Sequence, residues 1–151
     1  MAYTTAAQVS NGMKITIINL QKKVPIYPQK IKKPILKALK EEGEKEEGEI
    51  TVCFTNDALI RKLNARYLRK NKPTDVLAFD ITNPKDKGQL SADIVISSDT
   101  AIRNARVFKT TPFYELSLYS IHGLLHLLGY NDHSRKDKKI MRGKELKYVH
   151  T

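Results

Sequence analysis

The segment that begins at Thr111 constrains the fold more than any other, because the start and the end of a helix can both be located in it. Thr111 is a helix-capping residue, and it is followed by Pro112, a residue type favoured at the first helical position. Gly129 is a residue type that commonly ends a helix. His122 and His126 lie between these ends, four residues apart, so the sequence predicts a helix with two imidazoles on one face.

The rest of the chain predicts a single α+β domain. Four segments are rich in Ile and Val or alternate apolar and polar residues, which predicts strands at 14–20, 49–54, 72–81 and 90–97. Apolar residues at helical spacing and capping residues predict four more helices, at 27–45, 56–68, 98–108 and 134–149. This order predicts a small mixed four-stranded sheet covered by about five helices, and residues 1–151 contain no repeat or linker that would divide them.

The composition and the first residues favour a soluble protein of the cytoplasm. Cys53 is the single cysteine, so the chain can form no internal disulfide, and we expect this thiol in the core. No apolar stretch approaches the ~20 residues of a membrane span. Residues 1–12 lack the charged and apolar segments of a signal peptide, and we interpret them as a mobile tail. We therefore expect a cytoplasmic protein with no membrane and no disulfide partner.

A strong excess of positive charge indicates a polyanionic partner. The chain has 27 Lys and Arg residues against 16 Asp and Glu, a formal net charge of +11. Nucleic acid is the commonest polyanion of a cytoplasm. Basic runs occur at 61–72 and 135–147, and Arg66, Lys70 and Lys72 in the first run are candidate RNA contacts. The alternative interpretation is that both runs are solvated helix faces.

The two helical histidines predict a metal centre. His122 and His126 can bind one cation together, and the chain after Gly129 can turn back to supply a third ligand. Such a site keeps an open coordination position, as a catalytic zinc ion requires. We predict one Zn²⁺ per chain; another divalent metal such as nickel suits the same ligands. The alternative is that the histidines interact with the helix dipole or make hydrogen bonds in the core.

This pattern resembles that of the metzincin zinc proteases, His-Glu-x-x-His-x-x-Gly-x-x-His. His122, His126 and Gly129 are in register with it, which implies a metzincin-like metal-site helix. Gly123, however, stands where the proteases carry the glutamate that acts as general base. Glycine has no proton to transfer, which argues against ordinary peptidase chemistry. We expect Gly123 to leave room beside the metal.

A second resemblance is closer. The sequence HGLLHLLGY at 122–130 is similar to the signature of the YbeY family of bacterial metal-dependent endoribonucleases, His-Gly-x-Leu-His-Leu-x-Gly-Tyr-Asp-His. Other blocks of that family are resembled, in the same order, by LN at 63–64, PTDVLAF at 73–79 and DIVIS at 93–97. The resemblance covers most of the chain after its first third.

The resemblance implies a single-strand-specific, metal-dependent endoribonuclease that acts in ribosomal RNA maturation, including the 3′ end of 16S rRNA, and in ribosome quality control. Its implied partners are ribosomal RNA and the ribosome or small-subunit proteins. Metal-activated water can attack the phosphodiester, or the metal can stabilise charge while the RNA 2′-hydroxyl attacks. Two alternatives are a divergent zinc peptidase-like hydrolase and a non-catalytic RNA- or ribosome-binding factor with a structural metal.

The sequence departs from the family signature just after Tyr130. The family has Tyr-Asp-His at this point, whereas Tyr130 is followed by Asn131, Asp132 and His133, one residue more. In strict register Asp132 occupies the position of the third metal ligand. We predict His133 as that ligand, because a loop absorbs one extra residue easily, with Asp132 as the alternative.

A second departure concerns an arginine that the family carries in a Tyr-Arg pair before PTDV. Leu68 occupies the matching position, and Arg69 is the substitute candidate for a catalytic role. Tyr130, beside the predicted ligands, is a candidate for stacking on an RNA base, or else it packs against the end of the helix. Asp75 lies where a strand leaves its turn, and we expect it to brace that turn.

Overall fold

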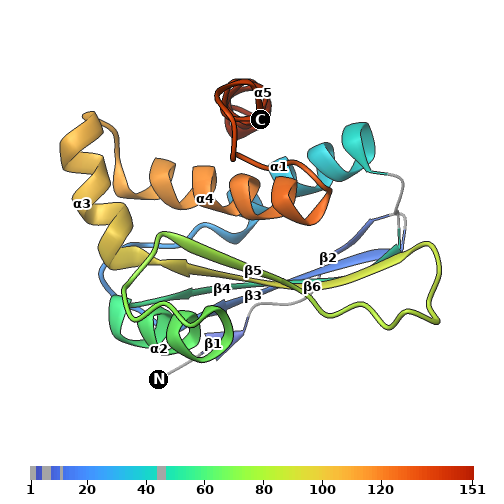
Figure 1. The fold of residues 1–151 in the computed structure, drawn as a ribbon, viewed down its shortest axis with the longest axis horizontal. Helices are drawn as coiled ribbons and strands as arrows, with labels where there is room; N and C mark the ends of the chain where they lie inside the picture. The colour runs from blue at the N-terminus through green and yellow to red at the C-terminus, as the bar shows by residue number, and fades with distance from the viewer. Residues whose placement is uncertain (1–2, 5–7, 11, 44–46) are drawn as a thin grey trace.

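A computed structural model describes residues 3–4, 8–10, 12–43 and 47–151 of the chain (Figure 1). Six strands lie within these residues: β1 (Tyr3–Thr4), β2 (Gln8–Ser10), β3 (Met13–Asn19), β4 (Glu47–Thr55), β5 (Val76–Asp80) and β6 (Gln89–Ser97). The same residues contain five helices: α1 (Pro28–Glu42), α2 (Asp57–Leu68), α3 (Ser98–Phe108), α4 (Pro112–Leu127) and α5 (Arg135–Val149). None of these described helices has both the length and the apolar character needed to cross a membrane.

The six strands of the described residues belong to one mixed sheet. β3, β4 and β6 are parallel, β5 pairs antiparallel with β6 at one edge, and β1 and β2 pair antiparallel with β3 at the other. The predicted α+β class, the four predicted strands and the five predicted helices are confirmed. The predicted helix 27–45 ends earlier, at Glu42, and its positions 44–45 lie outside the described residues. β1 and β2 are additional short strands within the range 1–12 that we interpreted as a tail. Of that range, residues 1–2, 5–7 and 11 lie outside the described residues.

Helices cover both faces of the sheet. α1, α3, α4 and α5 lie on one side and α2 lies on the other, with α5 outermost across α1 and α4 (Figure 1). The main core forms between the sheet and the pair α1 and α4, and it includes Ile17, Ile35, Val52, Ile94 and Leu124. Each such side chain contributes about 1.5–3 kcal/mol by leaving water. Burial on this scale fixes the position of α4 on the sheet.

A smaller core lies between α2 and the opposite face of the sheet. It consists of Ile60, Leu77 and Val95, and Cys53 packs against it. Burial, together with the nearby Asp93 carboxylate, raises the pKa of the Cys53 thiol to about 11. The thiol is therefore protonated at neutral pH, and Cys53 is a packing residue, as its place in an apolar run predicts.

α4 lies very close to the sheet at Gly123. A Cβ atom at this position would lie 3.0 Å from Cγ2 of Ile94 in β6 and 3.2 Å from Cγ2 of Val76 in β5. These distances are below the 3.5–4.0 Å of favourable carbon contacts, about the spacing at which dispersion attraction is greatest. We expected Gly123 to leave room beside a metal. The structure adds a different reason for the glycine, which is the close approach of the helix backbone to two strands.

The carboxylate of Glu42, the last residue of α1, joins three parts of the chain. It accepts hydrogen bonds from Tyr130 Oη at 2.6 Å, from Lys144 Nζ at 2.8 Å and from Tyr148 Oη. Its side chain is 7% exposed. Burial alone would raise the pKa of Glu42, but the bonds from Lys144, Tyr130 and Tyr148 outweigh burial and lower the pKa to about 2. The carboxylate thereby ties α1 and α5 to the loop that follows α4.

We expect Gly123→Val to lower the free energy of unfolding by about 1–3 kcal/mol, because the new side chain overpacks the contact between α4 and the sheet. Gly143→Val on α5 is the matched control, since a Cβ there meets nothing within 4 Å. The control should lose no stability, because valine has a higher helix propensity than glycine. Urea unfolding monitored by circular dichroism measures both; equal losses in the two variants would contradict the packing argument.

We expect Glu42→Gln to lower the free energy of unfolding at pH 7 by roughly 2 kcal/mol, because the buried charge-assisted hydrogen bonds are lost. The folded-state pKa of Glu42 is depressed, so its contribution is complete above the ordinary glutamate value and is lost as the pH falls toward about 2. The stability difference between wild type and variant should therefore be constant from pH 8 to about 5 and shrink below it. A difference that grows on acidification would contradict this.

Candidate metal centre

His122 and His126 lie on adjacent turns of α4 and point to the same place. Their Nε2 atoms are 3.0 Å apart. The helix that presents them begins as the sequence predicts, with the Thr111 hydroxyl accepting a hydrogen bond from the Tyr114 backbone N–H. Both imidazoles are partly buried, at 21% and 34% exposed.

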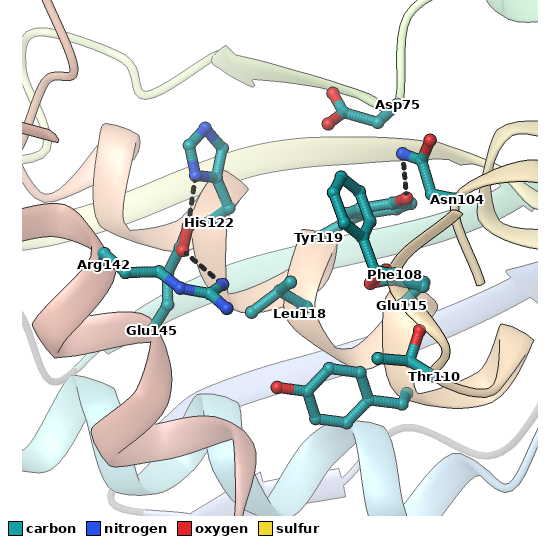
Figure 2. Close-up of a pocket in the computed structure, with 11 residues that line it drawn as sticks. Asp75, Asn104, Phe108, Thr110, Glu115, Leu118, Tyr119, His122, Arg142 and Glu145 are labelled. Carbon is teal, nitrogen blue, oxygen red and sulfur yellow. Dashed lines mark hydrogen bonds and ion pairs between the residues drawn. The ribbon is translucent and has the colours of Figure 1, made fainter. Parts of the chain in front are cut away.

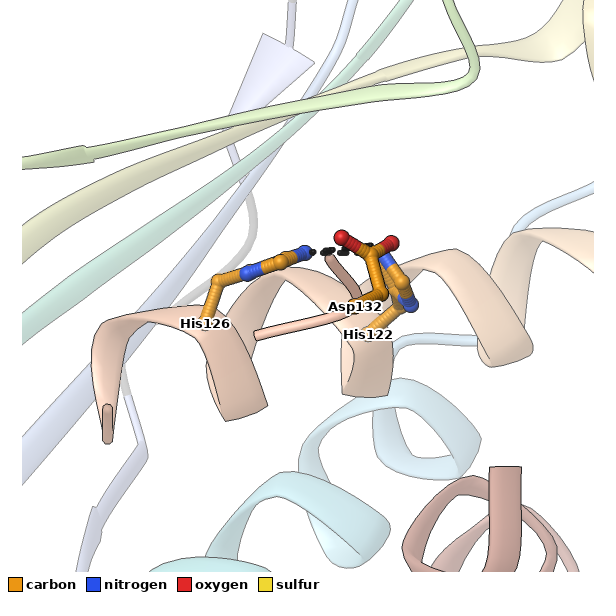
Figure 3. Close-up of side chains that lie close together, drawn as sticks. All are labelled: His122, His126 and Asp132. Carbon is orange, nitrogen blue, oxygen red and sulfur yellow. Dashed lines mark hydrogen bonds and ion pairs between the residues drawn. The ribbon is translucent and has the colours of Figure 1, made fainter. Parts of the chain in front are cut away.

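A carboxylate from the loop after α4 meets the histidine pair. Gly129 has a φ of 102°, a conformation that favours glycine, and it turns the chain back over the helix end. The Tyr130 N–H donates to the Leu125 carbonyl at 3.0 Å. The turn brings Asp132 Oδ2 to 3.6 Å from His122 Nε2 and 3.8 Å from His126 Nε2 (Figure 3).

The spacing of these three groups suits a metal ion. Two ligands about 2.0 Å from a tetrahedral ion lie about 3.3 Å apart. The three observed separations, 3.0, 3.6 and 3.8 Å, bracket that value. His122, His126 and Asp132 can therefore hold a metal ion. His133 is exposed, with its backbone N–H donating to Asn131 Oδ1, and it lines the same groove without belonging to this group.

Glu145 of α5 contacts the His122 ring at Nδ1, the nitrogen that is not part of the metal group. His122 Nδ1 lies 2.6 Å from Glu145 Oε2, and because an ionised carboxylate only accepts, Nδ1 carries the proton. Burial lowers the pKa of His122, but Glu145 outweighs it and the pKa is raised. Burial and the neighbouring His122 lower the pKa of His126. Fixing the proton on Nδ1 leaves Nε2 available as a metal ligand.

The metal group opens on a groove with positive charge at its edge. The groove has a volume of about 680 Å³, and Lys70 and Lys72 line it together with the two histidines and Asp132. Asn64 Nδ2 donates to the Lys72 carbonyl at 2.9 Å, which holds the lysine loop beside α2. The structure thus brings two of the predicted RNA contacts to the metal group.

Two other basic residues of the same run lie outside this groove. Arg69 ends α2 in a left-handed conformation with a φ of 57°, and it is exposed. Arg66 is exposed and lies over the Tyr67 ring, with its guanidinium carbon 5.4 Å from the ring centre. Neither belongs to the groove lining, which contains Leu68 at the position where the family carries its arginine.

Tyr130 and Asp75 have structural contacts. The Tyr130 hydroxyl donates a hydrogen bond to Glu42, and its ring packs against the main core; its contact with RNA stays a prediction. Asp75 braces its turn as expected: its carboxylate accepts from the Val76 N–H at 2.7 Å, and its carbonyl accepts from the Ser97 N–H. Asp75 also lines the groove.

Glu42 and Glu145 are supporting residues that no local pattern in the sequence indicates. Both lie far along the chain from the residues they hold: 88 positions separate Glu42 from Tyr130, and 23 separate Glu145 from His122. No local spacing connects residues on different helices, so only the packing of α1 and α5 on α4 reveals these pairs.

Two helical histidines and a loop carboxylate of this α+β fold converge at an open groove, the arrangement of proteins whose metal centre keeps an open coordination position. A family model described as Endoribonuclease YbeY matches residues 16–151. The chain belongs to the YbeY family, and the resemblance carried by HGLLHLLGY is confirmed.

Named relatives agree with the family, and one solved structure has a similar fold. Endoribonuclease YbeY of Carboxydothermus hydrogenoformans is 34% identical over 136 residues, covering 88% of this chain and 93% of that protein. Endoribonuclease YbeY of Anaeromyxobacter dehalogenans is 42% identical over 101 residues, covering 67% of this chain; the match spans 52% of that protein, about half its length. The solution structure of TM1509 from Thermotoga maritima is similar with a TM-score of 0.61 and 28% identity, covering 91% of this chain and 87% of that one.

We expect Glu145→Gln to weaken zinc binding by about 10- to 100-fold, because an amide holds the His122 ring less firmly than a carboxylate does. Competition with a chromophoric zinc chelator at pH 7.5 measures the affinity. Glu41→Gln is the matched control, since Glu41 pairs with exposed Lys147 and lies outside the metal group. The control should bind zinc like wild type; an unchanged affinity in Glu145→Gln would contradict the role of this carboxylate.

Proposed function

We propose that this chain is a metal-dependent endoribonuclease that cleaves single-stranded RNA in the cytoplasm. Its proposed process is ribosomal RNA maturation, including the 3′ end of 16S rRNA, and ribosome quality control, with the ribosome or small-subunit proteins as partners. The names of the relatives support the activity. The single observation that carries the proposal is a three-residue metal group in a groove edged by lysines.

Zn²⁺ is the proposed metal, with His122, His126 and Asp132 as its ligands. The two imidazoles and one carboxylate are a donor set that zinc accepts, and three protein ligands leave a position for substrate. We place Asp132 ahead of His133 because its carboxylate oxygen already lies 3.6–3.8 Å from both Nε2 atoms. His133 then lies at the groove wall, where an imidazole can contact RNA.

The reaction requires a nucleophile and the neutralisation of phosphate charge. A zinc ion at this group supplies Lewis-acid chemistry, lowering the pKa of water and polarising a phosphate oxygen. Glu145 keeps the proton on His122 Nδ1 and so preserves the ring orientation. Lys70 and Lys72 bind backbone phosphates along the groove. The products identify the nucleophile, because a 2′,3′-cyclic phosphate forms only when the 2′-hydroxyl attacks.

The two alternative functions have less support. A peptidase of the metzincin type needs a glutamate at position 123, where the close contact with Ile94 and Val76 favours glycine. A structural zinc has four protein ligands, whereas the described residues offer one group of three that faces an open groove.

We expect His126→Ala to lose bound zinc and to cleave single-stranded ribosomal RNA at least roughly 100-fold more slowly than wild type, because the metal supplies the Lewis acid. Elemental mass spectrometry of protein purified without a histidine tag gives the zinc content, and gel analysis of a labelled RNA gives the rate. Circular dichroism should show that the variant and the chelator-treated wild type stay folded. Cleavage that survives in the variant at the wild-type rate would overturn the proposal.

The third ligand is tested in the same assay with Asp132→Asn and His133→Ala. Asp132→Asn should lower zinc affinity, and His133→Ala should retain zinc. The reverse result would restore His133 as the third ligand. If chelation unfolds wild type, the metal is structural and the binding-factor alternative gains support.

A further inference from the structure

A second cavity lies on the other side of His122 from the metal groove. It has a volume of about 570 Å³, within the range of about 300–1,000 Å³ that is common for small-ligand sites. Its wall is formed by side chains of α3, α4 and α5 and by Asp75 (Figure 2). His122 and Asp75 line both this cavity and the metal groove. The His122 ring separates the two spaces, with Nε2 facing Asp132 and Nδ1 bonded to Glu145.

We propose that this cavity binds one nucleobase of the single-stranded RNA whose phosphodiester lies at the metal group. The inference rests on the proposed function and extends it by naming a base-binding site. Single-stranded RNA is recognised through bases that are splayed out and stacked on aromatic side chains. A cavity one imidazole ring away from the metal group is within reach of the nucleotide next to the bond that is cleaved.

Phe108 is the aromatic platform of the proposed site. It is the last residue of α3, it lines the cavity, and it is 65% exposed (Figure 2). It belongs to neither core cluster of the described residues. A phenylalanine exposed to this extent gains little from the fold, whereas a base stacked on it would remove its ring from water. Leu118 and Tyr119 add further apolar surface to the wall.

Two polar atoms of the cavity wall lack hydrogen-bond partners among the described residues. They are Thr110 Oγ1 and Glu115 Oε2. The Glu115 side chain is nearly completely buried, at 2% exposed; burial raises its pKa, and the neighbouring Thr110 side chain partly offsets that effect. Buried polar groups are usually paired. These two atoms are closed to solvent, so they add polarity to the cavity wall but make no direct contact with a ligand.

The charge of the cavity wall selects a base over a phosphate. Asp75, Glu115 and Glu145 contribute three carboxyl groups, and Arg142 contributes one guanidinium, whose Nη1 lies 3.5 Å from Glu145 Oε1. Carboxyl groups repel a phosphate and accept hydrogen bonds from the amino and imino groups of bases. The groove on the other side of His122 is lined by Lys70 and Lys72, two cations that can bind phosphate, together with Asp75 and Asp132.

The test compares Phe108→Ala with Val107→Ala. Val107 is the neighbouring residue, is 70% exposed and does not line the cavity, so it is a matched control for loss of exposed apolar surface. Zinc-loaded protein is titrated into a fluorescent single-stranded 2′-O-methyl RNA, which resists cleavage, and anisotropy gives the affinity. Phe108→Ala should bind roughly tenfold more weakly, the usual effect of losing one stacking contact, and Val107→Ala should bind like wild type.

Oligonucleotides with one abasic position identify the base. For wild type, one abasic position should weaken binding about as much as Phe108→Ala does, and combining the two should add nothing. The proposal is wrong if Phe108→Ala binds the RNA like Val107→Ala. It is also wrong if the affinity lost through Phe108→Ala adds in full to the affinity lost at every abasic position. If wild type fails to cleave unmodified RNA, the proposed nuclease activity is wrong. The measured affinities then still decide whether the cavity binds a base.

Discussion

The close contact between α4 and the sheet at Gly123 is the constraint on which the rest of the site depends. The helix backbone can lie against Ile94 and Val76 because no side chain separates them. His122 precedes this contact and His126 follows one turn later, so the packing that fixes the helix also fixes both imidazoles. The neighbouring residue Leu124 is buried in the main core, which locks the rotation of the helix about its own axis.

Carboxylates on α5 and α1 hold the metal group of α4 and its following loop in place. Glu145 reaches from α5 to orient His122, and Glu42 reaches from α1 to hold Tyr130, two residues before Asp132. Each is buried and held in place by its partners, Glu42 by Tyr130, Lys144 and Tyr148, and Glu145 by His122 and Arg142. The metal group is therefore supported by contacts among α1, α4 and α5, although its ligands come from one short stretch of chain.

Some features of the structure follow from neighbouring residues in the sequence, and others do not. The capping role of Thr111 and the turn at Gly129 follow from nearest neighbours, and the structure confirms both. Arg69 was chosen by its proximity in sequence to a family position; it caps α2 and is not among the residues that line the groove, although its neighbours Leu68 and Lys70 are. Nothing in the sequence near Tyr130 indicates the hydrogen bond that its hydroxyl donates to Glu42, 88 residues away. The position of a residue in the sequence does not tell whether its side chain points toward the site.

The sequence by itself determined the elements, the family and the pairing of His122 with His126, because helical periodicity and capping act over a few residues. Only the tertiary structure brought Asp132 to the histidine pair and Glu145 to the ring of His122, because those contacts depend on how a turn and a separate helix pack on α4. The same packing placed one imidazole between the groove that Lys70 and Lys72 line and the cavity that Glu115 and Glu145 line. That division depends on the arrangement of α3, α4 and α5 in space, which no local pattern of residues encodes.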